Sequence, residues 1–270
     1  MYFKLRFKMV NVKKKKRIIL FFVILLTVNI FTSCSTKKEQ NFKVEAKKIP
    51  ITPQSAESSK IENDINSFIA PYKQHIDTDL NATLCIATET FDKKNGKWES
   101  TIGNLMAEAT LELGNKVYNE QENKTVDFCI LNHGGIRSII PKGNVSTRTA
   151  YEVMPFENKL YVVTISGNAV LDLANYILKE KKPHPLAGIK IKTKNNAIHL
   201  VEINNEPLDI NKEYRVATTD YLANGGDSMN FLKNSNKKYD TNYKIRSLLI
   251  DYFKKVDTLP VIKTQRIIEL

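Results

Sequence analysis

The sequence is poor in the residues and patterns that mark unusual classes of protein. Its 270 residues include only 10 Gly, 9 Pro, 3 Cys and 1 Trp, and no apolar run reaches the roughly 20 residues that a membrane-spanning helix requires. The composition excludes collagen and wholesale disorder, and the lack of long apolar runs excludes a multi-span membrane protein. With 42% hydrophobic and 26% charged residues, the chain is typical of one or two globular domains with a sizeable core.

The positive charge of the chain is concentrated at its N-terminus. A formal net charge of +12 would in a globular domain favour nucleic acid or an anionic membrane as a partner. Eight of the 41 Lys and Arg residues, however, lie within the first 33 residues, which contain no Asp or Glu. The rest of the chain therefore has 33 basic and 29 acidic groups, a net charge of only +4. We expect no nucleic-acid polymer as a partner.

Residues 1–33 are typical of a bacterial export signal. A basic cluster at 13–17 is followed by an almost entirely apolar stretch, Ile18–Phe31, and then by small residues. Phe31-Thr32-Ser33-Cys34 resembles the lipobox of bacterial lipoproteins, in which the cysteine is lipidated and becomes the new N-terminus. We expect Cys34 to anchor the protein in the cell envelope through acyl chains, facing the periplasm. A signal anchor or a plain secretory signal is the alternative.

A polar segment separates this signal from one folded domain. Residues 34–57 contain Pro50, Pro53 and several Ser, as flexible tethers do. Residues 58–270 show helical and strand periodicities without a regular βαβ order, which predicts an α+β domain. Helices are expected from Ser58 or Ser59 onward and over Thr101–Val117, Gly167–Leu178 and Tyr243–Lys255; strands are expected over Leu84–Thr90, Val126–Leu131, Leu160–Ile165, Ile189–Thr193, Ile198–Ile203 and Glu213–Thr218.

The other two cysteines, Cys85 and Cys129, each lie in an apolar stretch. An oxidising periplasm would allow them to pair, but the apolar context favours two buried thiols that act as small hydrophobic side chains. There is no Cys-x-x-Cys spacing, and the four histidines are scattered. The sequence therefore predicts no metal site in this chain.

Three loops after or before predicted strands carry residues suited to a ligand. They read Asn132-His133-Gly134-Gly135-Ile136-Arg137, Met154-Pro155-Phe156-Glu157-Asn158 and Asp220-Tyr221-Leu222-Ala223-Asn224-Gly225-Gly226-Asp227. Paired glycines let a backbone approach a ligand closely, while amide, guanidinium and carboxylate groups suit oxygen-rich ligands. Taken singly, the glycine loops are equally compatible with tight turns, and Phe156 with a core position.

Together and in this order, the three loops resemble the C-terminal, substrate-binding domain of the 5′-nucleotidases, a family that includes UDP-sugar hydrolases and 2′,3′-cyclic nucleotide phosphodiesterases. Thr101–Met106 and Val163–Gly167 match as well, and the resemblance extends from about residue 60 to residue 268. It implies a mixed sheet with flanking helices. It also implies roles for five residues: Phe156 and Tyr221 stack on the nucleobase, Asn132 contacts its edge, Asp227 accepts from ribose hydroxyls, and Arg137 reaches ribose and phosphate.

The sequence departs from the family pattern at two positions. An arginine expected just before the Thr101 helix is absent, and Lys94 or Lys97 would replace it only loosely, which puts phosphate affinity in question. His133 stands where the family has a further glycine, and we expect this side chain to face solvent.

The resemblance assigns catalysis to a different domain. Family members hydrolyse phosphoesters at a dinuclear metal site in a metallophosphatase domain, whose Asp-x-His and Gly-Asn-His-Asp/Glu motifs do not occur here. We therefore expect no catalytic residue and no cofactor in this chain, and divalent metals on a separately encoded metallophosphatase that acts with it in nucleotide catabolism. One alternative is a non-catalytic periplasmic nucleoside- or nucleotide-binding lipoprotein. The other is a structural lipoprotein whose pocket binds nothing.

Overall fold

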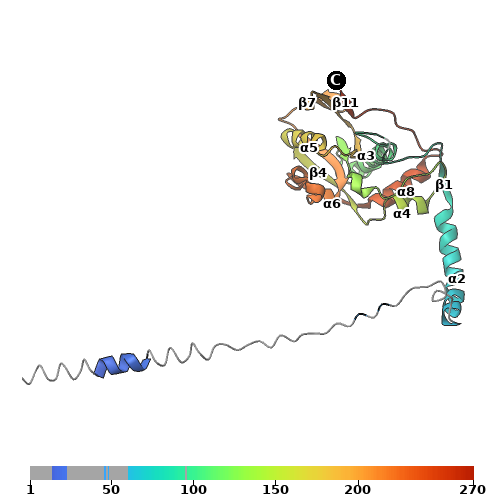
Figure 1. Cartoon of the computed structure of the whole chain (residues 1–270). Helices are drawn as coiled ribbons and strands as arrows, with labels where there is room; N and C mark the ends of the chain where they lie inside the picture. The colour runs from blue at the N-terminus through green and yellow to red at the C-terminus, as the bar shows by residue number, and fades with distance from the viewer. Residues whose placement is uncertain (1–13, 23–45, 47, 49–59, 95) are drawn as a thin grey trace, which may run out of the picture. The chain divides into compact units, whose positions relative to one another are not determined.

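The computed structural model describes residues 14–22, 46, 48, 60–94 and 96–270 (Figure 1). Residues 14–22 are helical, and Lys60–Leu270 is a compact unit of its own. Within these ranges no helix combines the length and the hydropathy needed to cross a membrane. Cys34 and almost all of the expected signal and tether lie outside the described residues, so those assignments stay predictions.

The unit Lys60–Leu270 contains a five-stranded mixed sheet with the strand order β10-β4-β9-β2-β5. Its strands are β2 (Phe128–Ile130), β4 (Lys159–Ser166), β5 (Leu186–Ala187), β9 (Glu213–Thr219) and β10 (Lys237–Lys244). Only β2 and β9 run parallel among the neighbouring pairs of this sheet, and β4 is antiparallel to β9, with Leu160 opposite Thr219. The ends of β2 and β9 and the start of β4 therefore lie at one edge.

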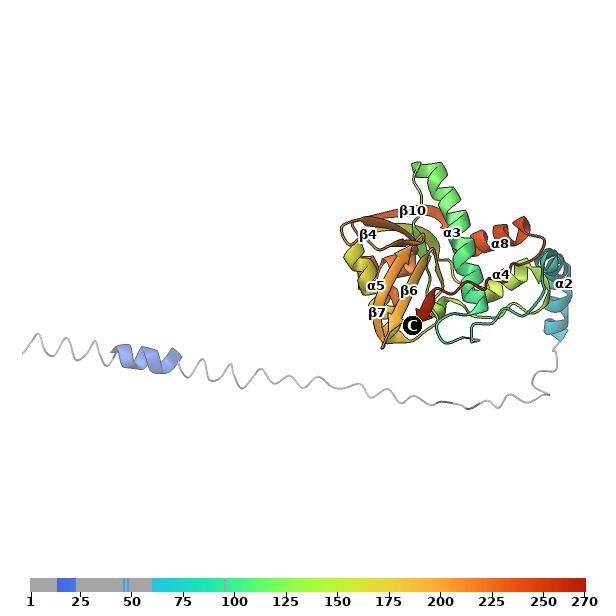
Figure 2. The same ribbon diagram turned by 90° about the horizontal axis from the view of Figure 1, so that it is seen from above.

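Two hydrophobic clusters cover the two faces of this sheet. Because side chains alternate along a strand, Cys129 packs in the cluster that contains Leu105, while its neighbours Phe128 and Ile130 pack in the cluster that contains Val170. Helices α3 (Thr101–Glu122) and α8 (Ile245–Lys255) lie on the first face, and α5 (Gly167–Glu180) on the second (Figure 2).

A second sheet lies beside α5 and has the strand order β11-β6-β7-β8. It consists of β6 (Ile189–Lys194), β7 (Ala197–Ile203), β8 (Glu206–Pro207) and β11 (Ile267–Glu269). β7 turns into β8 through Asn204 and Asn205, which both have positive φ, as hairpin turns of this kind require.

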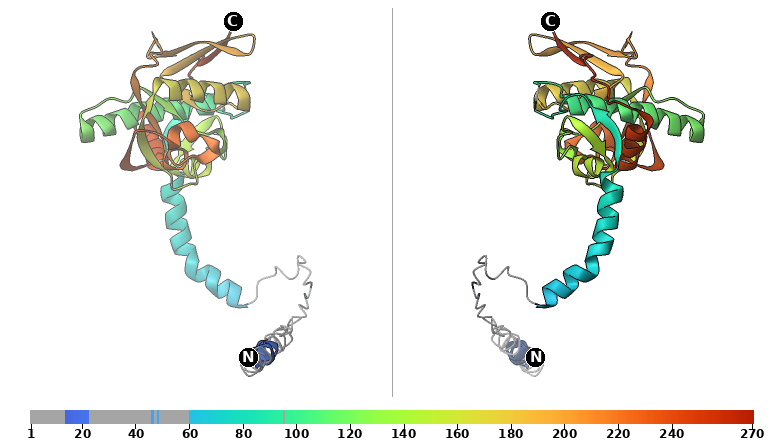
Figure 3. Two further views of the ribbon diagram at one scale, coloured as in Figure 1. Left: turned by 90° about the vertical axis from the view of Figure 1, so that its left-hand side faces the viewer. Right: turned by 90° about the vertical axis from the view of Figure 1, so that its right-hand side faces the viewer.

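The remaining elements belong to neither of these two sheets. α2 (Lys60–Asn81) precedes β1 (Thr83–Ala87), which pairs antiparallel with β3 (Gly143–Ser146), and β3 leads directly into α4 (Thr147–Val153). Figure 3 shows that α2 meets the rest of this unit at its C-terminal end. The short helices α6 (Asp220–Ala223), η3 (Gly226–Ser228) and α7 (Asn230–Lys233) follow β9.

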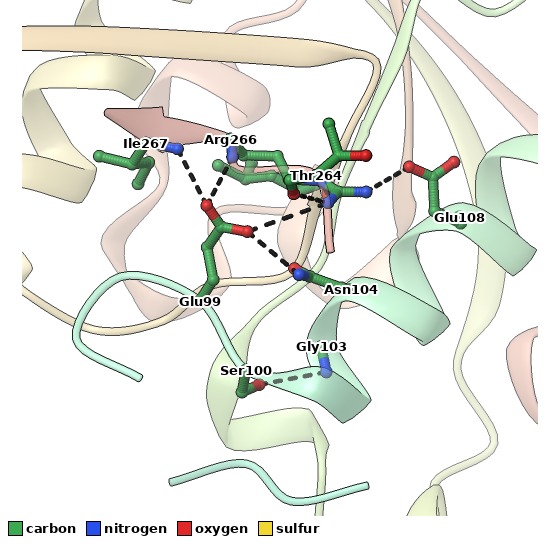
Figure 4. A network of polar contacts seen from close by, with 9 residues as sticks. Glu99, Ser100, Gly103, Asn104, Glu108, Thr264, Arg266 and Ile267 are labelled. Carbon is green, nitrogen blue, oxygen red and sulfur yellow. Dashed lines mark hydrogen bonds and ion pairs between the residues drawn. The ribbon is translucent and has the colours of Figure 1, made fainter. Parts of the chain in front are cut away.

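A polar network fastens β11 to the start of α3 (Figure 4). Glu99 accepts hydrogen bonds from the backbone N–H groups of Arg266 at 2.5 Å and Ile267 at 3.1 Å, and from the side-chain amide of Asn104 at 3.1 Å. The Arg266 side chain is almost fully buried and pairs with Glu108. The contacts join segments about 160 positions apart, so no local sequence pattern could have indicated them.

The predicted α+β class and mixed sheet are confirmed, as are the helices expected from residues 101, 167 and 243, each within a few positions. The strand predicted over Leu84–Thr90 ends earlier, at Ala87, and β3, α4, β5, β10 and β11 were not predicted. Cys85 and Cys129 are buried and unpaired, as expected. Burial raises the pKa of the Cys85 thiol to about 11 and that of Cys129 well above its usual value.

Candidate functional site

The three loops singled out in the sequence meet at the edge where β2 and β9 end and β4 begins. They enclose an open cavity of about 690 Å³. All five residues predicted to contact a ligand line it, together with five others that the loops contribute. The lining residues are Asn132, Gly134, Gly135, Arg137, Phe156, Glu157, Asn158, Asp220, Tyr221 and Asp227.

The loop after β2 folds tightly around the side chain of Asn132. One turn of 3-10 helix, η2 (His133–Gly135), places the Gly135 N–H 3.0 Å from the Asn132 carbonyl oxygen. A Cβ on Gly135 would lie only 2.8 Å from Asn132 Oδ1, so any other residue at this position would displace the Asn132 amide. Farther along, the Arg137 N–H donates to the carbonyl oxygen of Val153 at 2.9 Å, which joins this loop to the end of α4.

Arg137 and Phe156 contact each other at the mouth of the cavity. The guanidinium carbon lies 5.8 Å from the centroid of the Phe156 ring, within the range of a cation–π interaction. Both side chains are exposed, and 42% of Phe156 is accessible to solvent. The alternative of a core position for Phe156 is therefore wrong, and a large apolar ring instead stands beside a charged group that is free to meet a ligand.

The loop that carries Phe156 is held by a residue from a distant element. Arg246, on α8, is buried and donates from Nη1 to the carbonyl oxygens of Pro155 at 3.0 Å and Met154 at 3.4 Å. Its Nη2 donates to Glu157, and its guanidinium stacks on the ring of Tyr151 at 4.1 Å. Nothing in the sequence near Arg246 indicated this role, since about 90 positions separate it from the loop.

Tyr221 and Asp227 form a closed pair on the opposite wall. The Tyr221 hydroxyl donates to Asp227 Oδ1 at 2.9 Å and accepts from the Asp227 N–H at 3.1 Å. The Tyr221 ring lies flat against Gly226, where a Cβ would come within 2.4 Å of the ring. Asp227 itself has φ of 50°, in the left-handed region. Tyr176, on α5, donates to the Asp227 carbonyl oxygen at 2.7 Å and supports this conformation.

A hydrogen bond between Asn158 and Asp220 joins the second loop to the third. Asn158 Nδ2 donates to Asp220 Oδ1 at 2.8 Å, and the same oxygen accepts from the Tyr221 N–H at 2.7 Å. Both residues line the cavity, although the sequence had not assigned them a role. This contact couples the position of Tyr221 to the loop that carries Phe156.

A lysine that the sequence analysis did not select stands beside Arg137. Lys93 Nζ donates to the carbonyl oxygen of Ile136 at 2.7 Å. Partial burial lowers the pKa of Lys93, and the nearby positive charge of Arg137 lowers it further. Lys97, one of the two expected substitutes for the missing family arginine, instead pairs with Glu269 at 2.5 Å. Two cations with no carboxylate partner in the described contacts favour an anion at this end.

His133 and His184 contact each other at the loop that follows β2. The expectation that His133 faces solvent is wrong, because its side chain is half-buried and its Nδ1 atom is fully enclosed. The backbone N–H of His133 donates to Nδ1 of His184 at 3.3 Å. Burial lowers the pKa of His184 to about 4, so its ring is neutral at pH 7 and can accept this bond.

Among the described residues, no group of three or more His, Cys, Asp and Glu side chains is arranged to hold a metal ion. The cavity thus offers stacking surfaces, the Arg137 guanidinium with Lys93 beside it, and hydrogen-bonding groups. Such a set can bind a ligand that combines a flat ring, hydroxyl groups and an anion.

Comparison with known proteins gives a consistent match. The model of the family described as 5′-nucleotidase, C-terminal domain, matches residues 81–234. Protein UshA of Escherichia coli is 25% identical over 222 residues, which cover 80% of this chain and 38% of that protein. The 5′-nucleotidase of Mus musculus is 26% identical over 224 residues, covering 74% of this chain and 38% of the mouse protein.

Among solved structures, the 5′-nucleotidase precursor from Thermus thermophilus superimposes with a TM-score of 0.64 at 25% identity. The superposition covers 77% of this chain and 43% of that structure. The chain therefore spans less than half of the length of each of these relatives. The match concerns the domain that contains the cavity, since residues 81–234 include all ten residues that line it.

Proposed function

The chain belongs to the 5′-nucleotidase C-terminal domain family, and on that premise we propose that its cavity recognises a nucleoside or nucleotide for a 5′-nucleotidase-type phosphohydrolase. One observation carries the proposal. Phe156 and Tyr221 are large aromatic side chains that stay about half exposed, and both line one cavity with Asp227 and Arg137. The volume of about 690 Å³ lies within the range of small-molecule sites.

Each part of a nucleotide has a suitable partner in this cavity. A base that stacks on Phe156 and Tyr221 would gain roughly 1–3 kcal/mol per ring with little dependence on which base it is. Asp227 uses Oδ1 for Tyr221, which leaves Oδ2 to accept from ribose hydroxyls. Arg137, with Lys93 beside it, would meet the phosphate. Asn132 would contact the base through its amide.

Hydrolysis is assigned in this proposal to a separately encoded metallophosphatase, whose divalent metals would activate water and stabilise the developing charge. The chain would act as its recognition subunit in nucleotide catabolism, anchored through Cys34 in the cell envelope and facing the periplasm. A non-catalytic nucleoside- or nucleotide-binding lipoprotein is the second candidate. It uses the same cavity and requires no partner enzyme.

Calorimetry with adenosine and AMP tests the recognition step. The chain should bind both, and Phe156→Ala should weaken binding by roughly 5- to 150-fold, the equivalent of one lost stacking contact. The control for Phe156→Ala is Phe68→Ala, which removes an exposed ring outside the cavity. The control for Asp227→Asn is Asp172→Asn, which neutralises an exposed carboxylate on α5. No heat with either ligand would rule out both nucleotide functions.

A second measurement separates the two candidates. Adding the metallophosphatase encoded nearest to this chain, with Mn²⁺ or Zn²⁺, should release phosphate from AMP faster than either protein alone. If the chain binds nucleotide but produces no gain in rate, the non-catalytic binding lipoprotein is the better description.

A further inference from the structure

Helix α2 presents an apolar stripe that nothing in the domain covers among the described residues. Five large side chains at spacings of three and four residues share one face of the helix, each between 43% and 71% exposed. These residues, which we call the α2 stripe, are Ile65, Phe68, Ile69, Tyr72 and Ile76. Phe68 and Tyr72 contact each other, with ring centroids 5.9 Å apart.

The helix binds its own domain through a different, polar face. Arg148, on α4, donates to Asn81 Oδ1 at 2.7 Å and to Asp77 Oδ1 at 2.5 Å. At about 100° per residue, Asp77 and Asn81 lie a quarter turn or more around the helix from Ile76. An amphipathic helix normally packs its apolar face on its own core. Here the orientation is reversed, which leaves the α2 stripe available to another body.

Helix α4 contacts both α2 and the loop that carries Arg137 at the cavity. α4 contacts α2 through Arg148 at its start, and at its end the Val153 carbonyl accepts from the N–H of Arg137. Helix α4, which is seven residues long, therefore connects α2 to the end of the cavity where Arg137 lies, with Lys93 beside it. A body that docked on α2 would have a defined position relative to a phosphate bound there.

We infer that the α2 stripe is the docking surface for the metallophosphatase that the proposed function requires. This inference rests on that function and adds where the partner binds. The family match begins at residue 81, so α2, which ends at Asn81, stands on the N-terminal side of the matched domain. Because the family is described as a C-terminal domain, the rest of each relative precedes it in the chain, and in this chain α2 is the adjacent helix on that side.

Paired substitutions on α2 test the docking surface. In the full chain, purified in mild detergent, Phe68→Gln with Tyr72→Gln removes both rings while keeping residues that suit a helix. Affinity for the metallophosphatase encoded nearest to the chain should fall roughly 30-fold or more, as when aromatic interface residues are lost. Gln74→Ala with Thr78→Gln, on the opposite face of α2, should leave that affinity unchanged.

Two further readouts decide what the stripe binds. Adenosine and AMP affinities should be the same in both double variants, because the substituted side chains lie outside the cavity. Full partner affinity and full phosphate release by Phe68→Gln/Tyr72→Gln would overturn the inference. It would also be overturned if that variant only shifted the sedimentation of the chain from dimer to monomer, since the stripe would then pair two copies.

The wild-type chain distinguishes failure of the inference from failure of the proposed function. If wild type gives no heat with nucleotide, or if its mixture with the metallophosphatase releases no additional phosphate, the proposed function fails and the docking inference falls with it. If wild type passes both tests, only the double variants bear on the α2 stripe.

Discussion

Replacing Arg246 by methionine should weaken both the fold and the cavity. The Arg246 side chain is only 8% exposed, and its guanidinium donates to two backbone carbonyls of the Phe156 loop, at 3.0 and 3.4 Å. Methionine keeps much of the side-chain length and apolar volume but removes every donor. Hydrogen bonds from a charged group contribute about 1.5–3 kcal/mol each. Because the loop is exposed and water can replace part of the loss, we expect a decrease of about 2–4 kcal/mol in the free energy of unfolding.

The ion pair between Arg246 and Glu157 should matter much less than these carbonyl contacts. Glu157 is 60% exposed and also pairs with Lys244 at 2.5 Å, so it stays solvated when Arg246 is lost. Because Glu157 is exposed, solvent screens its attraction to Arg246, and such a pair contributes about 0–1 kcal/mol. Glu157→Gln is therefore the matched control, and it should lower the free energy of unfolding by no more than about 1 kcal/mol.

Urea denaturation and adenosine calorimetry together check this reasoning. Arg246→Met should lower the urea midpoint and, in whatever protein remains folded, weaken adenosine binding, because Phe156 is no longer held at the cavity. Equal stability losses for Arg246→Met and Glu157→Gln would show that the carbonyl contacts contribute little. A large loss of stability with unchanged adenosine affinity would refute the claim that Arg246 positions Phe156.

Three other substitutions test the contacts of Tyr221, Lys93 and His184. Tyr221→Phe removes the hydroxyl bonded to Asp227 and keeps the ring, so calorimetry should show adenosine affinity reduced by about five- to tenfold, near the value of one hydrogen bond; a loss as large as that of Tyr221→Ala would contradict a separate role for the hydroxyl. Lys93→Ala should reduce affinity for AMP more than for adenosine. The control Lys97→Ala, at a residue paired with Glu269, should reduce neither affinity. Equal effects of Lys93→Ala on the two ligands would place Lys93 away from the phosphate. Burial lowers the pKa of His184 to about 4, so the unfolded chain binds a proton at this histidine more readily than the folded chain does. The free energy of unfolding should therefore be unaffected by His184 above pH 6.5 and should fall by about 3 kcal/mol as the pH drops from 6.5 to 4. Urea titrations of His184→Gln should lack that part of the pH dependence.

Local patterns predicted the parts of this protein that depend on neighbouring residues. The helix at Thr101 begins where predicted because Ser100 caps it, its side chain accepting from the Gly103 N–H at 3.1 Å. The glycine pairs marked close packing at Gly135 and Gly226, where a Cβ would collide with the side chains of Asn132 or Tyr221. The motif order also identified five residues that line one cavity, although their contacts with a ligand stay a prediction.

Contacts between distant segments followed no such pattern. Lys93 was indistinguishable in sequence from Lys94 and Lys97, and only the path of the loop brings it beside Arg137. Arg246 and Arg266 are ordinary basic residues until the fold buries them against carbonyls and carboxylates. His133 was expected in solvent, but His184, 51 positions later, lies behind its loop.

The sequence by itself determined which loops can offer aromatic, amide, guanidinium and carboxylate groups to a ligand, because this depends on residue type and local spacing. Only the tertiary structure decided that these loops share one cavity, because that depends on strand order and direction: β2 parallel to β9, and β4 antiparallel to it. It also decided which face of α2 meets the domain. The helical spacing of Ile61, Ile65, Phe68 and Ile69 predicted a helix, but the helix binds α4 through Asp77 and Asn81, and Ile65, Phe68 and Ile69 are exposed.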